Sequence, residues 1–136
     1  MNSDLEMFRT TIKLAEQMLA LTTEMNQNFN KRAVGLENGY KALKLDIARM
    51  KVLFEVEAEL DKMEQTNFDM EKQITETIEQ LDRNAILFLQ TYPDSKEREE
   101  VLKAAYNGHR TLERSKEELS RLRRSSERLL TGMLAV

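Results

Sequence analysis

The sequence predicts an all-α protein with coiled-coil character: an elongated helical hairpin made of one long helix, a turn at Pro93 and a returning helix, with a three-helix bundle as the alternative. Its composition supports this. Of 136 residues, 33% are charged and 40% hydrophobic, with only four glycines and one proline, which is typical of long helices. Apolar residues also recur at alternating three- and four-residue steps, which places them on one stripe of a helix.

Residues 1–54 are expected to form an N-terminal helix that faces a partner. Between residues 5 and 25 a second apolar row widens the stripe, and its members are Met7, Leu14, Met18, Leu21 and Met25. A two-stranded coiled coil needs only one seam, so a wider face indicates two or more neighbouring helices. The predicted partner-binding residues are those of the first stripe: Leu5, Phe8, Ile12, Leu19, Phe29, Leu36, Leu43 and Ile47.

Residues 26–40 leave two alternatives open. Gly35 and the Asn38-Gly39 pair favour a turn near 35–39, which would produce a three-helix bundle. The three-four spacing keeps the same phase from Leu19 to Tyr40, which favours a continuous helix, since a loop has no reason to preserve the helical phase. We expect the continuous helix.

Residues 55–136 are expected to fold as an antiparallel helical hairpin. Pro93 ends the first arm because it lacks a backbone N–H and disfavours helical geometry at Tyr92. Asp94 is a predicted N-cap, with Glu97 completing a capping box, for a helix over about 95–134. The two arms carry their own seams, which are Leu60, Met63, Met70, Ile74 and Leu81 in the first and Leu112, Leu119, Leu122 and Leu129 in the second.

The charges of the two arms are complementary. Residues 55–100 hold nine more acidic than basic side chains, whereas residues 101–136 hold four more basic than acidic ones. Folding about Pro93 brings the acidic arm beside the basic arm, which favours this antiparallel arrangement over a like-charged one.

Polar residues interrupt the seams at Thr22, Asn26, Asn67 and Thr77. A buried Asn in a seam can fix the register of helix packing while costing stability. Local fraying or a kink is the alternative.

The composition argues against several classes of function. The chain has no Cys and one His, His109, so it offers no disulfide and no recognisable zinc site. We find no phosphate-binding glycine loop and no nucleophile elbow, and we expect no enzymatic activity, cofactor, metal or small-molecule substrate. The net charge of −3 argues against nucleic-acid binding.

The chain shows no apolar run of about 18 residues, so we expect no membrane span. Its charged start, with no apolar run, is unlike a secretory signal. We therefore expect an intracellular protein, cytoplasmic or nuclear.

Ser125 and Ser126 are candidate phosphorylation sites, because arginines precede them at 121, 123 and 124. A phosphate there would add about −1.5 to −2 charge to a packed interface and should loosen it. The alternative is that this basic segment is a salt-bridge face turned toward another helix.

These observations predict a non-enzymatic structural or scaffold subunit that assembles by coiled-coil packing with other helical proteins in a larger intracellular complex. We expect a hetero-oligomer, with a homodimer as the alternative. The second function considered is a small helical chaperone or adaptor that binds an amphipathic client segment along residues 5–25.

Overall fold

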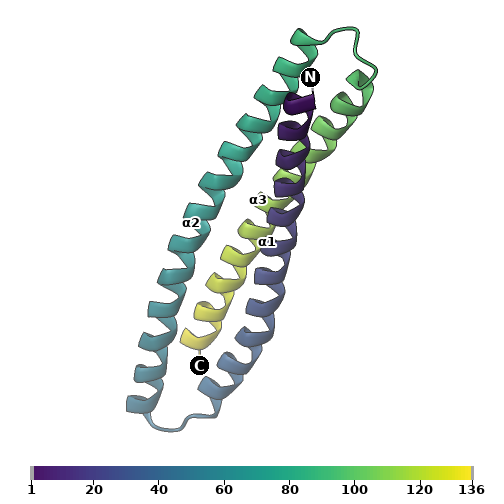
Figure 1. Cartoon of the computed structure of the whole chain (residues 1–136). Coiled ribbons are helices and arrows are strands. Elements are labelled where there is room, and N and C mark those ends of the chain that lie inside the picture. Colours follow the sequence, from purple (N-terminus) through teal and green to yellow (C-terminus); the bar gives the residue numbers. More distant parts are fainter. Residues whose placement is uncertain (1, 136) are drawn as a thin grey trace.

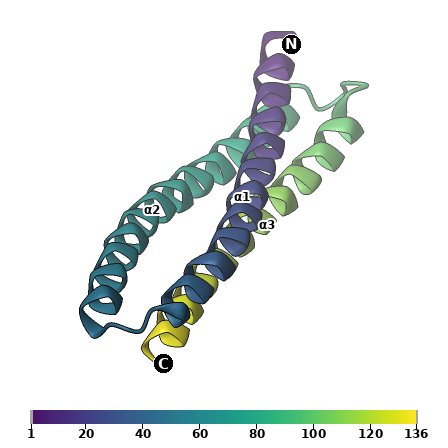
Figure 2. The same cartoon turned by 90° about the horizontal axis from the view of Figure 1, so that it is seen from below.

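The computed structural model describes residues 2–135 and contains three helices: α1 (Asn2–Ala42), α2 (Asp46–Thr91) and α3 (Arg98–Leu134). Helices α1 and α3 run in the same direction and α2 runs against both (Figure 1). Seen from below, α1 lies in front of the other two, with α2 on one side and α3 on the other (Figure 2). The all-α prediction is confirmed, and the architecture is the three-helix bundle, which was the alternative to the long-helix hairpin.

The chain turns at residues 43–45, so the expected continuous helix from residue 1 to 54 is wrong. The backbone N–H of Leu43 donates to the Tyr40 carbonyl (3.1 Å), and Arg49 Nε donates to the Leu43 carbonyl (2.7 Å). The boundary expected at 54/55 therefore falls inside α2, and residues 46–54 belong to that helix.

Residues 26–40 are helical throughout, as expected, and the alternative turn at 35–39 is wrong, because Gly35 and Gly39 lie inside α1. A Cβ added at either glycine would meet open space. An exposed helical glycine costs about 1 kcal/mol relative to alanine. Tyr40, which follows Gly39, is buried in the core, and such packing stabilises the helix that contains both glycines.

The turn at Pro93 is confirmed, although α3 begins three residues later than expected. The N-cap is Glu97 rather than Asp94, which corrects the predicted capping box. Ser95 Oγ accepts a hydrogen bond from the Glu97 backbone N–H (3.2 Å). Tyr92 Oη donates to Asp4 Oδ2 (2.8 Å), which fastens this end of α2 to the first turn of α1.

Two apolar clusters, one toward each end of the bundle, form the core. The cluster near the Pro93 turn includes Leu5, Phe8, Ile74, Leu81, Phe88, Val101, Leu112 and Leu119. The cluster near the 43–45 turn includes Phe29, Tyr40, Val56, Leu122, Leu129 and Met133. Full burial of each large side chain contributes about 1.5–3 kcal/mol, so all three helices are held by residues that the sequence places in seams.

Gly108 lets α3 approach both other helices closely. A Cβ at this position would lie 2.6 Å from Ile12 Cδ1 and 2.9 Å from Leu81 Cδ2, which is closer than van der Waals contact allows. A side chain at Gly108 would therefore require the ends of the Ile12 and Leu81 side chains to shift, whereas one at Gly35 or Gly39 would not.

The antiparallel pairing of α2 and α3 brings opposite charges together, in agreement with the charges of the two arms. Arg123 lies 3.4 Å from Glu71, and His109, which is charged only when protonated, lies 3.2 Å from Asp82. These side chains are substantially exposed, so each pair contributes only about 0–1 kcal/mol. They favour the arrangement, while the apolar clusters stabilise it.

Candidate functional site

Neither a metal site nor a membrane span is found in the part of the chain that the structure describes. Within residues 2–135, no three His, Asp or Glu side chains gather in a way that would hold a metal ion. His109 contacts Asp82 and, at 3.6 Å, Glu113. The three helices described also lack any segment apolar enough to cross a membrane.

Most of the residues predicted to bind a partner pack inside the chain itself. Leu5, Phe8 and Phe29 are buried. The half-buried residues of the set are Ile12, Leu19, Leu36 and Leu43. Only Ile47 is free, with 85% of its surface exposed. In the single chain, α2 and α3 cover most of the stripe of α1. That these residues bind a partner stays a prediction.

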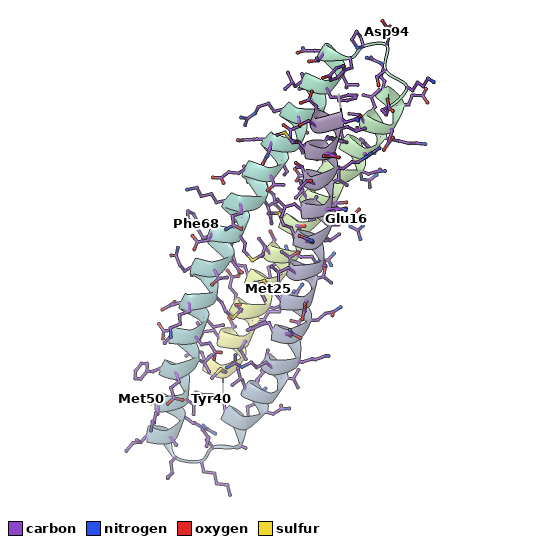
Figure 3. All side chains as sticks on the ribbon, in the orientation of Figure 1. Glu16, Met25, Tyr40, Met50, Phe68 and Asp94 are labelled. Atoms are coloured by element: carbon purple, nitrogen blue, oxygen red, sulfur yellow. The ribbon has the colours of Figure 1, made fainter. Side chains whose placement is uncertain are left out.

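The outer side of α2 carries apolar side chains that no other helix covers. Ile47, Met50 and Phe54 follow at steps of three and four, and Phe68 lies fourteen residues beyond Phe54, on about the same side of the helix. Figure 3 shows Met50 and Phe68 projecting away from α1 and α3. Phe54 and Phe68 are 59% and 62% exposed. We call these four residues the α2 outer stripe.

The turn at 43–45 explains why the stripe faces outward. In sequence, Ile47, Met50 and Phe54 continue the seam of α1, but α2 turns a different side to the core. Val52, Leu53 and Val56 pack into the cluster near the 43–45 turn. The side chains of the stripe point roughly the opposite way, because successive helical residues are about 100° apart.

A second exposed row lies on α1. Met7, Leu14 and Leu21 recur every seven residues and are exposed, whereas Met18 and Met25 pack against the core. Met7 lies one turn from Asp4 and Thr11, which meet Tyr92 and Asn84. The row of Met7, Leu14 and Leu21, here called the α1 row, therefore follows the outer edge of the contact between α1 and α2.

The two candidate phosphorylation sites face different grooves. Ser126 is half-buried, donates to the Leu122 carbonyl (3.0 Å) and lines a hollow between α2 and α3. Ser125 is half-buried in the groove between α1 and α3, among arginines. Phosphorylation at either serine remains a prediction.

The Pro93 end carries the two ionisable groups with a displaced pKa. The hydrogen bond from Tyr92 to Asp4 raises the pKa of Tyr92. The hydroxyl of Ser95, which donates to the Glu97 carboxylate (2.6 Å), lowers the pKa of Glu97. Tyr92 joins the end of α2 to α1, and Glu97 bonds within the turn itself, so local hydrogen bonds account for both shifts.

Comparison with protein-family models, with curated proteins and with solved structures finds no match to this chain. The exposed surfaces are therefore the observations on which a function can be argued. The spacing in the sequence shows that apolar residues of α2 share a side of the helix. It does not predict that Ile47, Met50, Phe54 and Phe68 face solvent and not the core.

Proposed function

We propose that this protein is a non-enzymatic structural subunit that binds an amphipathic helix of another protein along the α2 outer stripe, as part of an intracellular complex. The proposal rests on one observation. The apolar seams of the three helices pack against one another inside the bundle, whereas Ile47, Met50 and Phe54 remain exposed at the three- and four-residue steps with which helices pack.

The chemistry of the stripe suits a helical partner. A three-four series presents one line of side chains, which is the geometry that a second helix packs against. Phenylalanine and methionine supply large or adaptable apolar area, and aromatic residues are enriched in interface cores. Covering each large side chain contributes about 1.5–3 kcal/mol before the cost of association.

The charge on the stripe favours a foreign helix over a second copy of this chain. Asp61 lies midway between Phe54 and Phe68 and makes no ion pair within the described residues 2–135. An antiparallel pairing that sets Phe54 against Phe68 of a second copy would place Asp61 against Asp61. An in-register parallel pairing would do the same. Such like-charge contacts are unfavourable at interfaces, so we expect a partner with Lys or Arg opposite Asp61.

Site-specific photocrosslinking in the source cells tests this proposal. A benzophenone amino acid at position 54 should give one discrete adduct with another protein, and the same amino acid at exposed Glu16 of α1 should give none. Asp61→Lys should reduce the adduct at position 54, whereas Asp94→Lys, in the Pro93 turn, should leave it unchanged. Adducts only with a second copy of the chain, or equal adducts at positions 54 and 16, would contradict the proposal.

A chaperone is the second candidate, and the α1 row favours it. Exposed Met7, Leu14 and Leu21 lie beside the half-buried Met18 and Met25, and methionine-rich surfaces adapt to varied apolar segments. If this function holds, the purified protein should suppress aggregation of an amphipathic client peptide. Leu14→Gln should weaken that effect, and Phe54→Gln should not.

A further inference from the structure

The groove between α1 and α3, toward the 43–45 turn, holds a basic hollow of about 320 Å³. This volume is at the lower end of the range for small-ligand pockets. Its lining is entirely polar and contains no carboxylate: Asn26 and Asn30 from α1, and Arg121, Arg124, Ser125 and Arg128 from α3.

The positive charge of this hollow is only partly neutralised. Glu118 accepts hydrogen bonds from Arg121 Nη1 (3.0 Å) and from Asn26 Nδ2 (2.8 Å). A second acid, Glu37, lines the adjoining hollow with Arg128 and pairs with Lys41 (3.1 Å). Arg124 and Arg128 have no ion-pair partner among residues 2–135. Residues 25–36 of α1 contain no acid at all. Two guanidinium groups without an ion pair in the described part of the chain therefore lie at one groove of a protein whose net charge is −3.

The other lining groups are suited to an oxyanion. The Asn30 amide lies 3.4 Å from Asn26 Oδ1, a long hydrogen bond that a stronger acceptor could replace. The hydroxyl of Ser125 can donate to an oxygen in the groove. Guanidinium groups bind phosphate oxygens in pairs, and such charge-assisted hydrogen bonds are stronger than neutral ones.

From these observations we propose that the α1–α3 groove is a binding site for a phosphate-bearing ligand, a phosphate monoester or a diphosphate, held by Arg121, Arg124 and Arg128 with the Asn30 amide. The charge of a phosphate monoester, about −1.5 to −2 at pH 7, matches the two arginines that lack an ion pair among the described residues, and the higher charge of a diphosphate can also use Arg121. The site lies on a different groove from the α2 outer stripe, so it does not depend on the proposed helix docking.

Titration of the ¹⁵N-labelled full chain with inorganic pyrophosphate at low salt tests the proposal. We expect saturable shifts of the Asn26 and Asn30 side-chain amides and of the arginine Nε–H resonances. The double variant R124Q/R128Q should bind pyrophosphate at least about tenfold more weakly. The control R83Q/K103Q removes the same charge from exposed positions on α2 and α3 and should bind like the unsubstituted chain.

Ser125→Glu provides a second, independent variant. It places a fixed negative charge among the arginines and should also block pyrophosphate. Thermal unfolding of each variant should match the unsubstituted chain, because the substituted side chains lie at the surface or are half-buried. Absence of shifts in the groove, or equal weakening by R124Q/R128Q and R83Q/K103Q, would overturn the proposal.

A vesicle experiment distinguishes a free ligand from a lipid headgroup. Phosphatidylcholine vesicles with phosphatidylinositol 4-phosphate are compared with vesicles of equal charge made with phosphatidylserine. Sedimentation with the first alone, lost in R124Q/R128Q, would support the site and assign it to a lipid phosphate monoester. Pyrophosphate binding without sedimentation would support it and assign a soluble ligand. Binding to neither probe would overturn it.

Discussion

Asn67 places an amide in the core between α2 and α3. Its side chain is 2% exposed, and Oδ1 has no hydrogen-bond partner among residues 2–135. It lies beside a hollow of about 190 Å³ that Leu60, Arg123 and Ser126 also line. An unpaired buried polar group costs about 1–3 kcal/mol. Asn67 therefore lowers the stability of the bundle, which is the cost expected of a seam asparagine that fixes the register of helix packing.

Asn67→Leu should therefore stabilise the protein by about 1–2 kcal/mol, because it removes the unpaired amide. The adjacent hollow has room for the larger side chain. Urea unfolding followed by circular dichroism measures the change, and Asn107→Leu, at an exposed position of α3, serves as the control. A loss of stability in Asn67→Leu would mean that the amide is satisfied in solution.

Two phenylalanines separate core from surface. Phe8 is 1% exposed in the cluster near the Pro93 turn, whereas Phe54 lies on the α2 outer stripe. Phe8→Ala should cost about 3–5 kcal/mol, and Phe54→Ala less than about 0.5 kcal/mol. Chemical denaturation of both variants measures this. Similar losses would show that Phe54 is buried, either within the chain or against a second copy.

At the scale of elements, the start of α2 is weakly specified. Leu45 occupies its N-cap in an extended conformation, makes no side-chain cap bond and is 72% exposed. Leucine is among the poorest N-cap residues, because it cannot accept a bond from the free N–H groups of the first turn. The position of this turn is set by packing on either side of it.

Leu45→Asp should stabilise the protein by about 0.5–2 kcal/mol through a new N-cap hydrogen bond. Thermal or urea unfolding measures the gain. Lys44→Asp, one residue earlier, changes the charge by more but cannot cap in the same way, and should have a smaller effect. An equal gain in the two variants would indicate a general electrostatic cause, and no gain would place the helix start elsewhere.

The Pro93 end should respond to alkaline pH through Tyr92. The hydrogen bond to Asp4 raises the pKa of Tyr92 above its usual 10.0 in the folded protein. The stability from this contact is therefore fully present below about pH 10 and is lost as pH rises through the folded pKa. Unfolding measured from pH 9 upward should show this decline, and Tyr92→Phe should reduce it. An unchanged decline in Tyr92→Phe would assign it to another group.

The sequence predicted some elements well because their signals are local. Pro93 stops a helix by its own chemistry, and the seams of α2 and α3 follow from spacing. The 43–45 turn has no such signal: Leu-Lys-Leu contains no breaker, whereas the glycines that suggested a turn remain helical. The candidate surface could not be predicted for the same reason. The spacing places Ile47 in the same apolar series as the seam of α1, but it does not show whether Ile47 faces the core or solvent once α2 is a separate helix.

At the scale of the whole molecule, the bundle separates three surfaces. The seam of α1 is closed by α2 and α3, the outer side of α2 presents exposed apolar residues, and the α1–α3 groove is basic near the 43–45 turn. The closed seam makes the α2 outer stripe a separate surface. Were α1 and α2 one continuous helix, Ile47, Met50 and Phe54 would simply extend the same seam.

The distance between α1 and α2 tests most directly whether they are separate, packed helices. Because the chain has no cysteine, spin labels can be attached at two chosen positions. Spin labels at Thr10→Cys and Gln80→Cys, both exposed, should lie within about 20–30 Å in the bundle, where packed helix axes are 8–10 Å apart and the labels add their own length. A continuous helix would separate them by about 105 Å. Pulsed electron spin resonance on a sample shown to be monomeric by light scattering measures it. The short distance is the expected result, and the long one would contradict both the bundle and the independent docking surface.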